Sequence, residues 1–321
     1  MEPLVSIITP CYNGEKKVKK FIESVLEQTY NNIEFIIIND GSIDKTEDVV
    51  LSYKKNFEKR GYKFIYLKQE NKGQDVALNK GLKYFNGKYL MWTDSDDILD
   101  KNNVEKKVKF LEKNLNCGLV FCNAKIVREN ALDKIVKLWN KRLPKNKLDF
   151  FKDVMIGKDI VFAGGAWMAR SENFLSVRPN RSIEIIGLGQ NWQMLLPLVY
   201  NFQIGKIDEV LFTYIIYNNS DSNKKRSYEK RKEYICKQKN GLENILDNIK
   251  IDKKIRVDIN KIANNFINNL LLDAAIKYNR RDEFNKIYRN RLRGEYQFTI
   301  KQYIKYILYK YRLYNIYTKI R

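Results

Sequence analysis

The chain has 321 residues, 44% of them hydrophobic, which is enough for one large domain or a large domain with an appendage. It contains no histidine, which excludes histidine bases, Ser-His and Cys-His catalytic pairs and His-ligated zinc. The formal net charge is +22, and residues 221–321 carry 26 Lys/Arg against 11 Asp/Glu, so we expect the last third to attract polyanions or an anionic membrane surface.

The cysteines and the apolar segments favour a reducing, aqueous compartment. Cys11, Cys117 and Cys122 lie in apolar, strand-like contexts, and none of these or Cys236 forms the C-x-x-C spacing of a zinc or redox site. We therefore expect free thiols and a cytoplasmic protein. No apolar run reaches the roughly 18 residues that span a bilayer, and the N-terminus lacks the pattern of a signal peptide.

The first hundred residues alternate between strand-length apolar runs and segments with helical spacing. The predicted strands are residues 4–9, 33–39, 62–67 and 89–92, and the predicted helices are residues 18–26, 44–59 and 76–85. Because the connections are short, the alternation predicts an α/β fold with a mostly parallel sheet and right-handed crossovers. No dinucleotide-binding or P-loop motif is present.

Three of these strands end in polar turns, at residues 10–14, 40–42 and 94–97. The carboxyl ends of parallel strands meet at one edge of a sheet, so the turns can converge on one ligand. The last turn holds three carboxylates, which repel one another and favour a hard divalent cation such as Mg²⁺ or Mn²⁺. The alternative is that these carboxylates only form a turn that caps the next helix.

Further strands and helices are predicted up to residue 216. A helix follows residue 103, strands are expected at residues 119–122 and 126–127, another helix begins at Gln190, and residues 204–216 form one or two strands. The apolar residues 160–169 contain Gly164 and Gly165. Adjacent glycines there suit either a close backbone approach to a ligand or a buried strand with a bulge.

A linker at residues 217–223 separates this region from a basic helical one, with helices predicted at residues 235–246, 255–275 and 284–292. Residues 300–321 contain six Tyr and six Lys/Arg and no acid. On a helix, Lys305, Arg312 and Lys319 share one face, beside an apolar stripe of Ile304, Leu308, Tyr311 and Tyr314. This pattern favours an anionic membrane surface, with packing onto the rest of the chain or onto a partner protein as the alternatives.

Four motifs, taken in order, resemble those of the family 2 glycosyltransferases, which have the GT-A fold. They are residues 5–14 (VSIITPCYNG), 38–42 (INDGS), 71–73 (NKG) with 77–81 (ALNKG), and 94–97 (DSDD). The resemblance covers about residues 3–216. It implies a GT-A catalytic domain at residues 1–217, with nucleotide-sugar binding in 1–100 and the acceptor side in 101–217. The resemblance does not cover the tail, where the helical spacing predicts a helical extension at 218–321.

The resemblance implies a nucleotide-diphospho-sugar donor, most often a UDP-sugar. Pro10 and Tyr12 would flank the base, Asp40 would bond the base or ribose, Asp94 would reach the ribose or the metal, and Asp96 would ligate Mn²⁺ or Mg²⁺. The other donor-side residues implied are Asn13, Asn71, Gly73 and Ser95. The alternative for each residue is that it only ends a strand or shapes a turn.

Direct displacement at the anomeric carbon inverts the configuration and needs a base for the acceptor hydroxyl. Many relatives have a Glu-Asp pair at the helix start where this chain has Gln190 and Asn191, neither of which can take a proton near neutral pH. Glu184 is therefore the candidate base and Asp159 a weaker one. The acceptor-side residues implied are Asp97, Gly164, Gly165, Gln190, Asn191 and Trp192, the last of which is either a sugar platform or a core residue.

These features together predict an inverting, metal-dependent glycosyltransferase that works at the cytoplasmic face of the membrane. It would extend a lipid-linked or polysaccharide acceptor in a bacterial-type surface glycan. The alternatives are an inactive relative that only binds a sugar nucleotide, and a basic nucleic-acid-binding protein. Nucleic acid is not the expected partner, because no recognition-helix, zinc-finger or RNP pattern is present.

Overall fold

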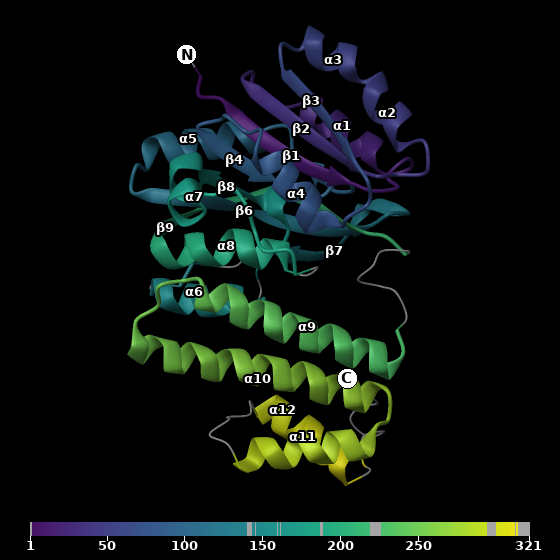
Figure 1. Cartoon of the computed structure of the whole chain (residues 1–321), viewed down its shortest axis with the longest axis vertical. Helices are drawn as coiled ribbons and strands as arrows, with labels where there is room; N and C mark the ends of the chain where they lie inside the picture. The colour runs from purple at the N-terminus through teal and green to yellow at the C-terminus, as the bar shows by residue number, and fades with distance from the viewer. Residues whose placement is uncertain are drawn as a thin grey trace. The chain divides into compact units, whose positions relative to one another are not determined.

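The computed structural model describes residues 2–139, 143–144, 146–158, 160, 162–186, 189–218, 226–293, 300–311 and 313. The chain forms two compact units, Met1–Lys224 and Lys225–Arg321, whereas the sequence analysis put the boundary between residues 217 and 218. Each unit is described by itself below (Figure 1).

The first half of unit 1 is the predicted alternation of parallel strands and helices. The strands are β1 (Val5–Cys11), β2 (Ile33–Asp40), β3 (Lys63–Gln69) and β4 (Tyr89–Trp92), and the helices are α1 (Val18–Leu26), α2 (Thr46–Ser52), α3 (Lys54–Lys59) and α4 (Gln74–Leu82). β2 and β4 both pair with β1 in parallel, and β3 pairs with β2. Every residue of β1, β2 and β4 is buried, as expected for parallel strands covered on both faces.

The prediction of a single helix over residues 44–59 is wrong, because the chain turns at Tyr53, between α2 and α3. The Tyr53 hydroxyl donates to Glu23 Oε1 at 2.8 Å, which ties this turn to α1. The change in direction lets Phe57 stack on Phe35 and Phe64, with ring centroids 5.1 and 4.9 Å apart. Aromatic packing on the sheet therefore decides the break.

The second half of unit 1 continues the sheet with mixed strand directions. It contains β5 (Ile98–Leu99), β6 (Cys117–Arg128), β7 (Ala131–Trp139), β8 (Trp167–Arg170) and β9 (Gln203–Ile216), with helices α5 (Asn103–Lys113), α6 (Lys147–Met155), α7 (Ser171–Val177) and α8 (Gln190–Asn201). The strand order is β3-β2-β1-β4-β8-β6-β9-β5, with β7 paired to β6. The two strands predicted at 119–122 and 126–127 are one long strand, β6, which extends its pairing with β9.

Of the two alternatives for residues 160–169, the buried strand with a bulge is met only in part, because the strand there begins at Trp167. A 3-10 turn, η1 (Gly164–Ala166), precedes β8. A Cβ added to Gly164 would collide with the Trp92 carbonyl oxygen, and one added to Gly165 would lie 2.8 Å from Thr93 Oγ1. The two glycines therefore let η1 pack directly on the protein backbone where β4 ends.

Unit 2 is helical in the residues that the structure describes, with α9 (Tyr228–Asp247), α10 (Lys253–Lys277), α11 (Arg281–Arg293) and α12 (Ile300–Lys310). No helix in the described ranges is long and apolar enough to cross a membrane. α12 buries Tyr306 and Tyr309 against Phe284 of α11, with centroids 6.2 and 4.8 Å apart. Lys305 donates to Asp273 Oδ1 of α10 at 2.6 Å, so this cation is directed inward.

The other face of α12 is apolar and exposed. The large exposed hydrophobic side chains on α12 and just after it are Ile300, Tyr303, Ile304, Tyr311 and Leu313. The helix thus combines packing within unit 2 with an uncovered apolar stripe. Of the tail residues singled out from the sequence, Arg312, Tyr314 and Lys319 lie outside the described residues.

Candidate active site

The turns after β1 and β2 are fixed to each other by reciprocal hydrogen bonds. The Asn13 backbone N–H donates to Ser42 Oγ at 2.9 Å, and the Ile43 N–H donates to Asn13 Oδ1 at 3.0 Å. Asn13 adopts φ +47°, a left-handed conformation that asparagine tolerates better than most residues. Tyr12, beside it, is 49% exposed, whereas Pro10 is buried within β1. Tyr12 is thus the accessible aromatic ring at this edge of the sheet.

Asp40, at the end of β2, holds the segment that leads into α4. Its Oδ1 accepts from Gln69 Nε2 at 2.7 Å and from the Lys72 N–H at 3.0 Å, and its Oδ2 accepts from the Gly73 N–H at 2.9 Å. Asp40 is buried, and a carboxylate has about four acceptor positions, so little capacity is left for a ligand. Asp40 thus shapes this turn, which is the alternative considered above for each implied site residue.

Asp94 lies between the beginnings of two helices. Its Oδ1 accepts from Gln74 Nε2 of α4 at 2.7 Å and from Gln190 Nε2 of α8 at 3.4 Å. Burial raises the pKa of Asp94 to about 6, and the charge of Asp96 adds to this rise. The predicted site residues from the two halves of unit 1 therefore meet at this carboxylate.

Asp96 faces a lysine that the sequence analysis did not single out. Lys17 Nζ lies 3.4 Å from Asp96 Oδ2 and 4.1 Å from the centroid of the Tyr217 ring. The Tyr217 hydroxyl donates to the Asp96 backbone carbonyl at 3.0 Å. Burial raises the pKa of Asp96, and the Lys17 ammonium opposes the rise. No spacing rule connects residues that are 79 positions apart in the chain.

The remaining residues of the acidic turn, Asp97 and Ser95, point into the protein. Asp97 Oδ1 accepts from the Ile215 N–H at 3.0 Å, while its buried Oδ2 has no hydrogen-bond partner in the part of the chain that the structure describes. Burial raises the pKa of Asp97 well above its usual range, with contributions from Asp96 and Asp94. Burial also raises the pKa of the Cys11 thiol to about 11, although a hydrogen bond with the Ser95 side chain opposes this rise.

Two carboxylates of this turn, Asp94 and Asp96, are available to a hard cation. Among the residues that the structure describes, no three His, Cys, Asp or Glu side chains form a cluster that could hold a metal ion. A cation at the turn would therefore take one or two oxygens from the protein and the rest from phosphate or water, which is usual for Mg²⁺. The residues present fit a cation of that kind.

The first residues of α8 adjoin the acidic turn, as the resemblance implied. Asn191 Oδ1 accepts from Trp92 Nε1 at 2.9 Å, and Asn191 Nδ2 donates to the Phe162 carbonyl at 2.8 Å. Gln190 Oε1 is buried and has no hydrogen-bond partner among the described residues. Trp192 is buried and meets Phe162 edge to face, with centroids 5.7 Å apart.

Glu184 is exposed, on a backbone segment fixed from both sides. Its N–H donates to Gln193 Oε1 at 2.7 Å, and its carbonyl accepts from Gln193 Nε2 at 2.9 Å. Asn79 of α4 holds the neighbouring Ile183 in the same two-way manner, at 2.7 and 2.8 Å. The segment therefore lies along α4, whose first residue contacts Asp94. Asp159, the weaker candidate, is outside the described residues.

Comparison with known proteins settles the family. The family model for glycosyl transferase family 2 matches residues 6–174, more than half of the chain. The chain belongs to this family. It is 40% identical over 148 residues to an uncharacterized glycosyltransferase of Rickettsia prowazekii, covering 46% of this chain and 44% of that protein. It is 36% identical over 137 residues to TuaG of Bacillus subtilis, named for teichuronic acid biosynthesis, covering 42% of this chain and 53% of TuaG.

Solved structures confirm the predicted GT-A fold. Residues 1–349 of TarS from S. aureus, crystallised with UDP, match with a TM-score of 0.52 at 16% identity, covering 92% of this chain and 94% of that one. The mannosyltransferase PcManGT from Pyrobaculum calidifontis, in complex with GDP-Man and Mn²⁺, matches with a TM-score of 0.57 at 15% identity, covering 92% and 77%.

Proposed function

We propose that this protein is a glycosyltransferase that moves a sugar from a nucleotide-diphospho-sugar to a hydroxyl group of a growing glycan. The observation that carries the proposal is the convergence of Gln74 and Gln190 on Asp94, in the turn after β4 where Lys17, from the segment after β1, reaches Asp96. Parallel strands bind ligands at such an edge. The named ligands of the two structural neighbours, UDP and GDP-Man, belong to the same chemical class.

The donor is a UDP-sugar in this proposal, and its base lies against the exposed ring of Tyr12. Asn13, Asn71, Gly73 and Ser95 belong to the turns at this edge, and Pro10 to β1. Asp40, which keeps the 69–73 segment in place, bonds the base or ribose through its remaining acceptor position. Asp94 contacts the ribose or the cation. The UDP and UDP-GlcNAc named in TarS structures favour uridine over other bases.

Asp96, with Asp94, holds Mn²⁺ or Mg²⁺. When bound, such an ion offsets the negative charge that develops on the departing diphosphate. Gly164 and Gly165 let η1 pack closely against Trp92 and Thr93, next to the acidic turn. The buried Asp97 accepts from the Ile215 N–H and so anchors β9 to the same turn. These contacts shape the acceptor side of the site.

Transfer is inverting in this proposal. The acceptor oxygen forms its bond to the anomeric carbon on the face opposite the diphosphate, the bond to the diphosphate breaks, and the hydroxyl proton passes to a base. Gln190 and Asn191 cannot take that proton. Glu184 is the candidate, because its backbone is fixed beside α4 while its carboxylate stays exposed.

A second candidate function is a sugar-nucleotide-binding protein without transferase activity. The observation in its favour is that amides occupy the first two positions of α8, where they contact Asp94 and Trp92. Two results together would select this candidate: UDP-sugars bind without being hydrolysed or transferred, and Glu184→Gln changes neither the binding nor the turnover. Transfer that Glu184→Gln abolishes would reject it.

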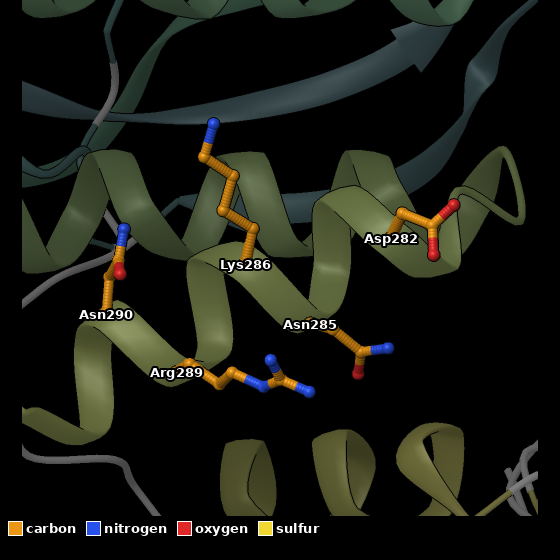
Figure 2. A pocket seen from close by; sticks show the side chains of 5 residues that line it. All are labelled: Asp282, Asn285, Lys286, Arg289 and Asn290. Carbon is orange, nitrogen blue, oxygen red and sulfur yellow. The ribbon is translucent and has the colours of Figure 1, made fainter.

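The acceptor is a lipid-linked or polysaccharide glycan, and unit 2 brings the enzyme to the inner face of the cell membrane. The exposed stripe of α12 supplies apolar contacts, and interfacial helices of this kind bind anionic lipids with neighbouring cations. α11 contributes Lys286 and Arg289, which with Asp282, Asn285 and Asn290 line a pocket of about 380 Å³. Figure 2 shows these side chains.

The test begins with a thermal-shift screen of nucleoside diphosphates and sugar nucleotides with and without Mn²⁺, because a ligand of the folded state raises the melting temperature. Hydrolysis and transfer of the stabilising sugar nucleotide are then compared between wild type and Asp96→Ala. We expect the variant to lose at least about 100-fold in rate, as when one transition-state contact is removed. Equal turnover would refute the role of Asp96.

A further inference from the structure

Lys17 lies at the acidic turn although it is outside the four motifs that carry the family resemblance. Its backbone N–H donates to the Gly14 carbonyl at 2.8 Å, in the turn that leads into α1. From there its side chain reaches Asp96, with 3.4 Å between Nζ and Oδ2. A cation of the protein thus already faces the carboxylate that is proposed to bind a metal ion.

The Lys17 ammonium is placed where it can exchange one anionic partner for another. The side chains of Lys17 and Asp96 are 30% and 31% exposed, so solvent and a ligand can reach the pair. Ion pairs of such exposure contribute little, typically about 0–1 kcal/mol, so the ammonium can leave Asp96 at small cost. The Tyr217 ring, 4.1 Å from Nζ, keeps the head of the side chain at the turn through a cation–π contact.

Lys17 and a divalent cation compete for the same oxygen. Two positive groups cannot both lie against Asp96 Oδ2 without strong repulsion. A diphosphate at this turn removes the conflict, because its oxygens accept hydrogen bonds from an ammonium while they complete the coordination of the cation. The arrangement therefore has two states, one without and one with a nucleotide.

We infer that Lys17 is a diphosphate-binding residue of the donor site, and that its ammonium passes from Asp96 to the diphosphate when the donor and its cation bind. This inference rests on the proposed function. Lys17 opposes binding of the cation alone and strengthens binding of the nucleotide alone. Because it contacts phosphate rather than base, its contribution is the same for UDP and GDP.

The experiment compares four forms of the full chain: wild type, Lys17→Met, Lys17→Arg and Lys19→Met. Methionine keeps most of the aliphatic stem over Tyr217 and removes the charge, whereas arginine keeps the charge. Lys19→Met is the matched control, since Lys19 lies two residues further along, in α1, and pairs with Glu23 at 3.8 Å. Calorimetry gives the Kd of UDP and GDP in EDTA, and electron paramagnetic resonance of free Mn²⁺ gives the Kd of Mn²⁺ alone.

We expect Lys17→Met to weaken metal-free binding of UDP and GDP alike, by about 10- to 100-fold, the usual effect of one charge-assisted hydrogen bond. It should also tighten binding of Mn²⁺ alone by roughly three- to tenfold, as removal of a nearby like charge does. Lys17→Arg should stay near wild type in metal-free nucleotide binding, and Lys19→Met should stay near wild type in both measurements.

Equal behaviour of Lys17→Met and Lys19→Met in both titrations would overturn the inference. Weaker UDP binding with unchanged Mn²⁺ binding would overturn the exchange between Asp96 and the diphosphate. If no form binds UDP with or without Mn²⁺, the proposed donor site itself is wrong. In that case, tighter Mn²⁺ binding by Lys17→Met would show that Lys17 only neutralises the charge of Asp96 and does not bind diphosphate. Circular dichroism checks each fold, and Lys17→Gln replaces Lys17→Met if that variant does not fold.

Discussion

The buried lysine of α5 gives a sharp test of the packing beside the site. Lys107 is fully buried, and its ammonium donates to Asn103 Oδ1 at 2.9 Å and to the Gly165 carbonyl at 2.8 Å. Burial lowers the pKa of Lys107 from 10.5 to about 8. In the folded state the proton therefore leaves near pH 8, whereas in the unfolded chain it stays until about pH 10.5.

The sign of the effect follows from which state binds more protons. Between pH 8 and 10.5 the unfolded chain binds more protons than the folded chain, because Lys107 is protonated only in the unfolded chain. The contribution of Lys107 to the free energy of unfolding therefore rises with pH in this range. Relative to Lys107→Met, the free energy of unfolding of wild type should rise by about 2–3 kcal/mol between pH 7 and pH 10. Other titrating groups are common to both proteins and cancel in the difference.

Urea unfolding followed by tryptophan fluorescence isolates the relevant unit, because Trp92, Trp139, Trp167 and Trp192 all belong to unit 1. Lys109→Met is the control: Lys109 lies on the same helix but is exposed and pairs with Glu105 at 2.6 Å. We expect its curve to run parallel to wild type across the pH range. A parallel curve for Lys107→Met as well would refute the claim that burial sets the protonation of Lys107.

Two further predictions concern the donor turn and the helical unit. Gly41→Ala should lower the stability of unit 1 by about 2–4 kcal/mol and weaken UDP binding. The reason is that φ of Gly41 is +71° and an added Cβ would collide with the Asn71 backbone nitrogen. Gly61→Ala is the control: its φ is +73° but the space around it is open, so it should cost only about 1 kcal/mol in the same urea assay. Tyr311→Ser, at a side chain 62% exposed just after α12, should reduce sedimentation with anionic vesicles severalfold, whereas Val257→Ser, 71% exposed on α10, should not. Equal sedimentation of both variants would contradict membrane contact through the end of α12.

The parallel half of the fold could be predicted because its strands are buried on both faces. β1 and β2 are mostly apolar, with Ser6, Thr9 and Glu34 as the polar residues before the sheet edge, so their ends and the polar turns after them are visible in the sequence. The break at Tyr53 could not be predicted in this way. It depends on the packing of Phe57 against strands that are distant in sequence.

The position of the acidic turn at the sheet edge could be predicted, because Asp94 and Asp96 closely follow the apolar run of β4. A contact could not be predicted where it depends on a partner far along the chain. Lys17 has no signature in its own segment, and Asp40 was expected to serve a ligand although three internal donors hold it. The direction of a polar side chain depends on where the nearest donors lie, and only the fold brings those together.

The hydrogen bonds of Asn191 explain why an amide stands at this position near the start of α8. Asn191 accepts from Trp92 Nε1 and donates to the Phe162 carbonyl, so it satisfies one donor and one acceptor at once. A carboxylate could accept from Trp92 but could not donate to Phe162, which would leave a carbonyl unpaired beside a new charge close to the acidic turn. The local structure therefore requires an amide at this position. In the proposed transfer, the base for the acceptor hydroxyl would then come from another segment, such as that of Glu184, whose backbone is held by Gln193 of α8.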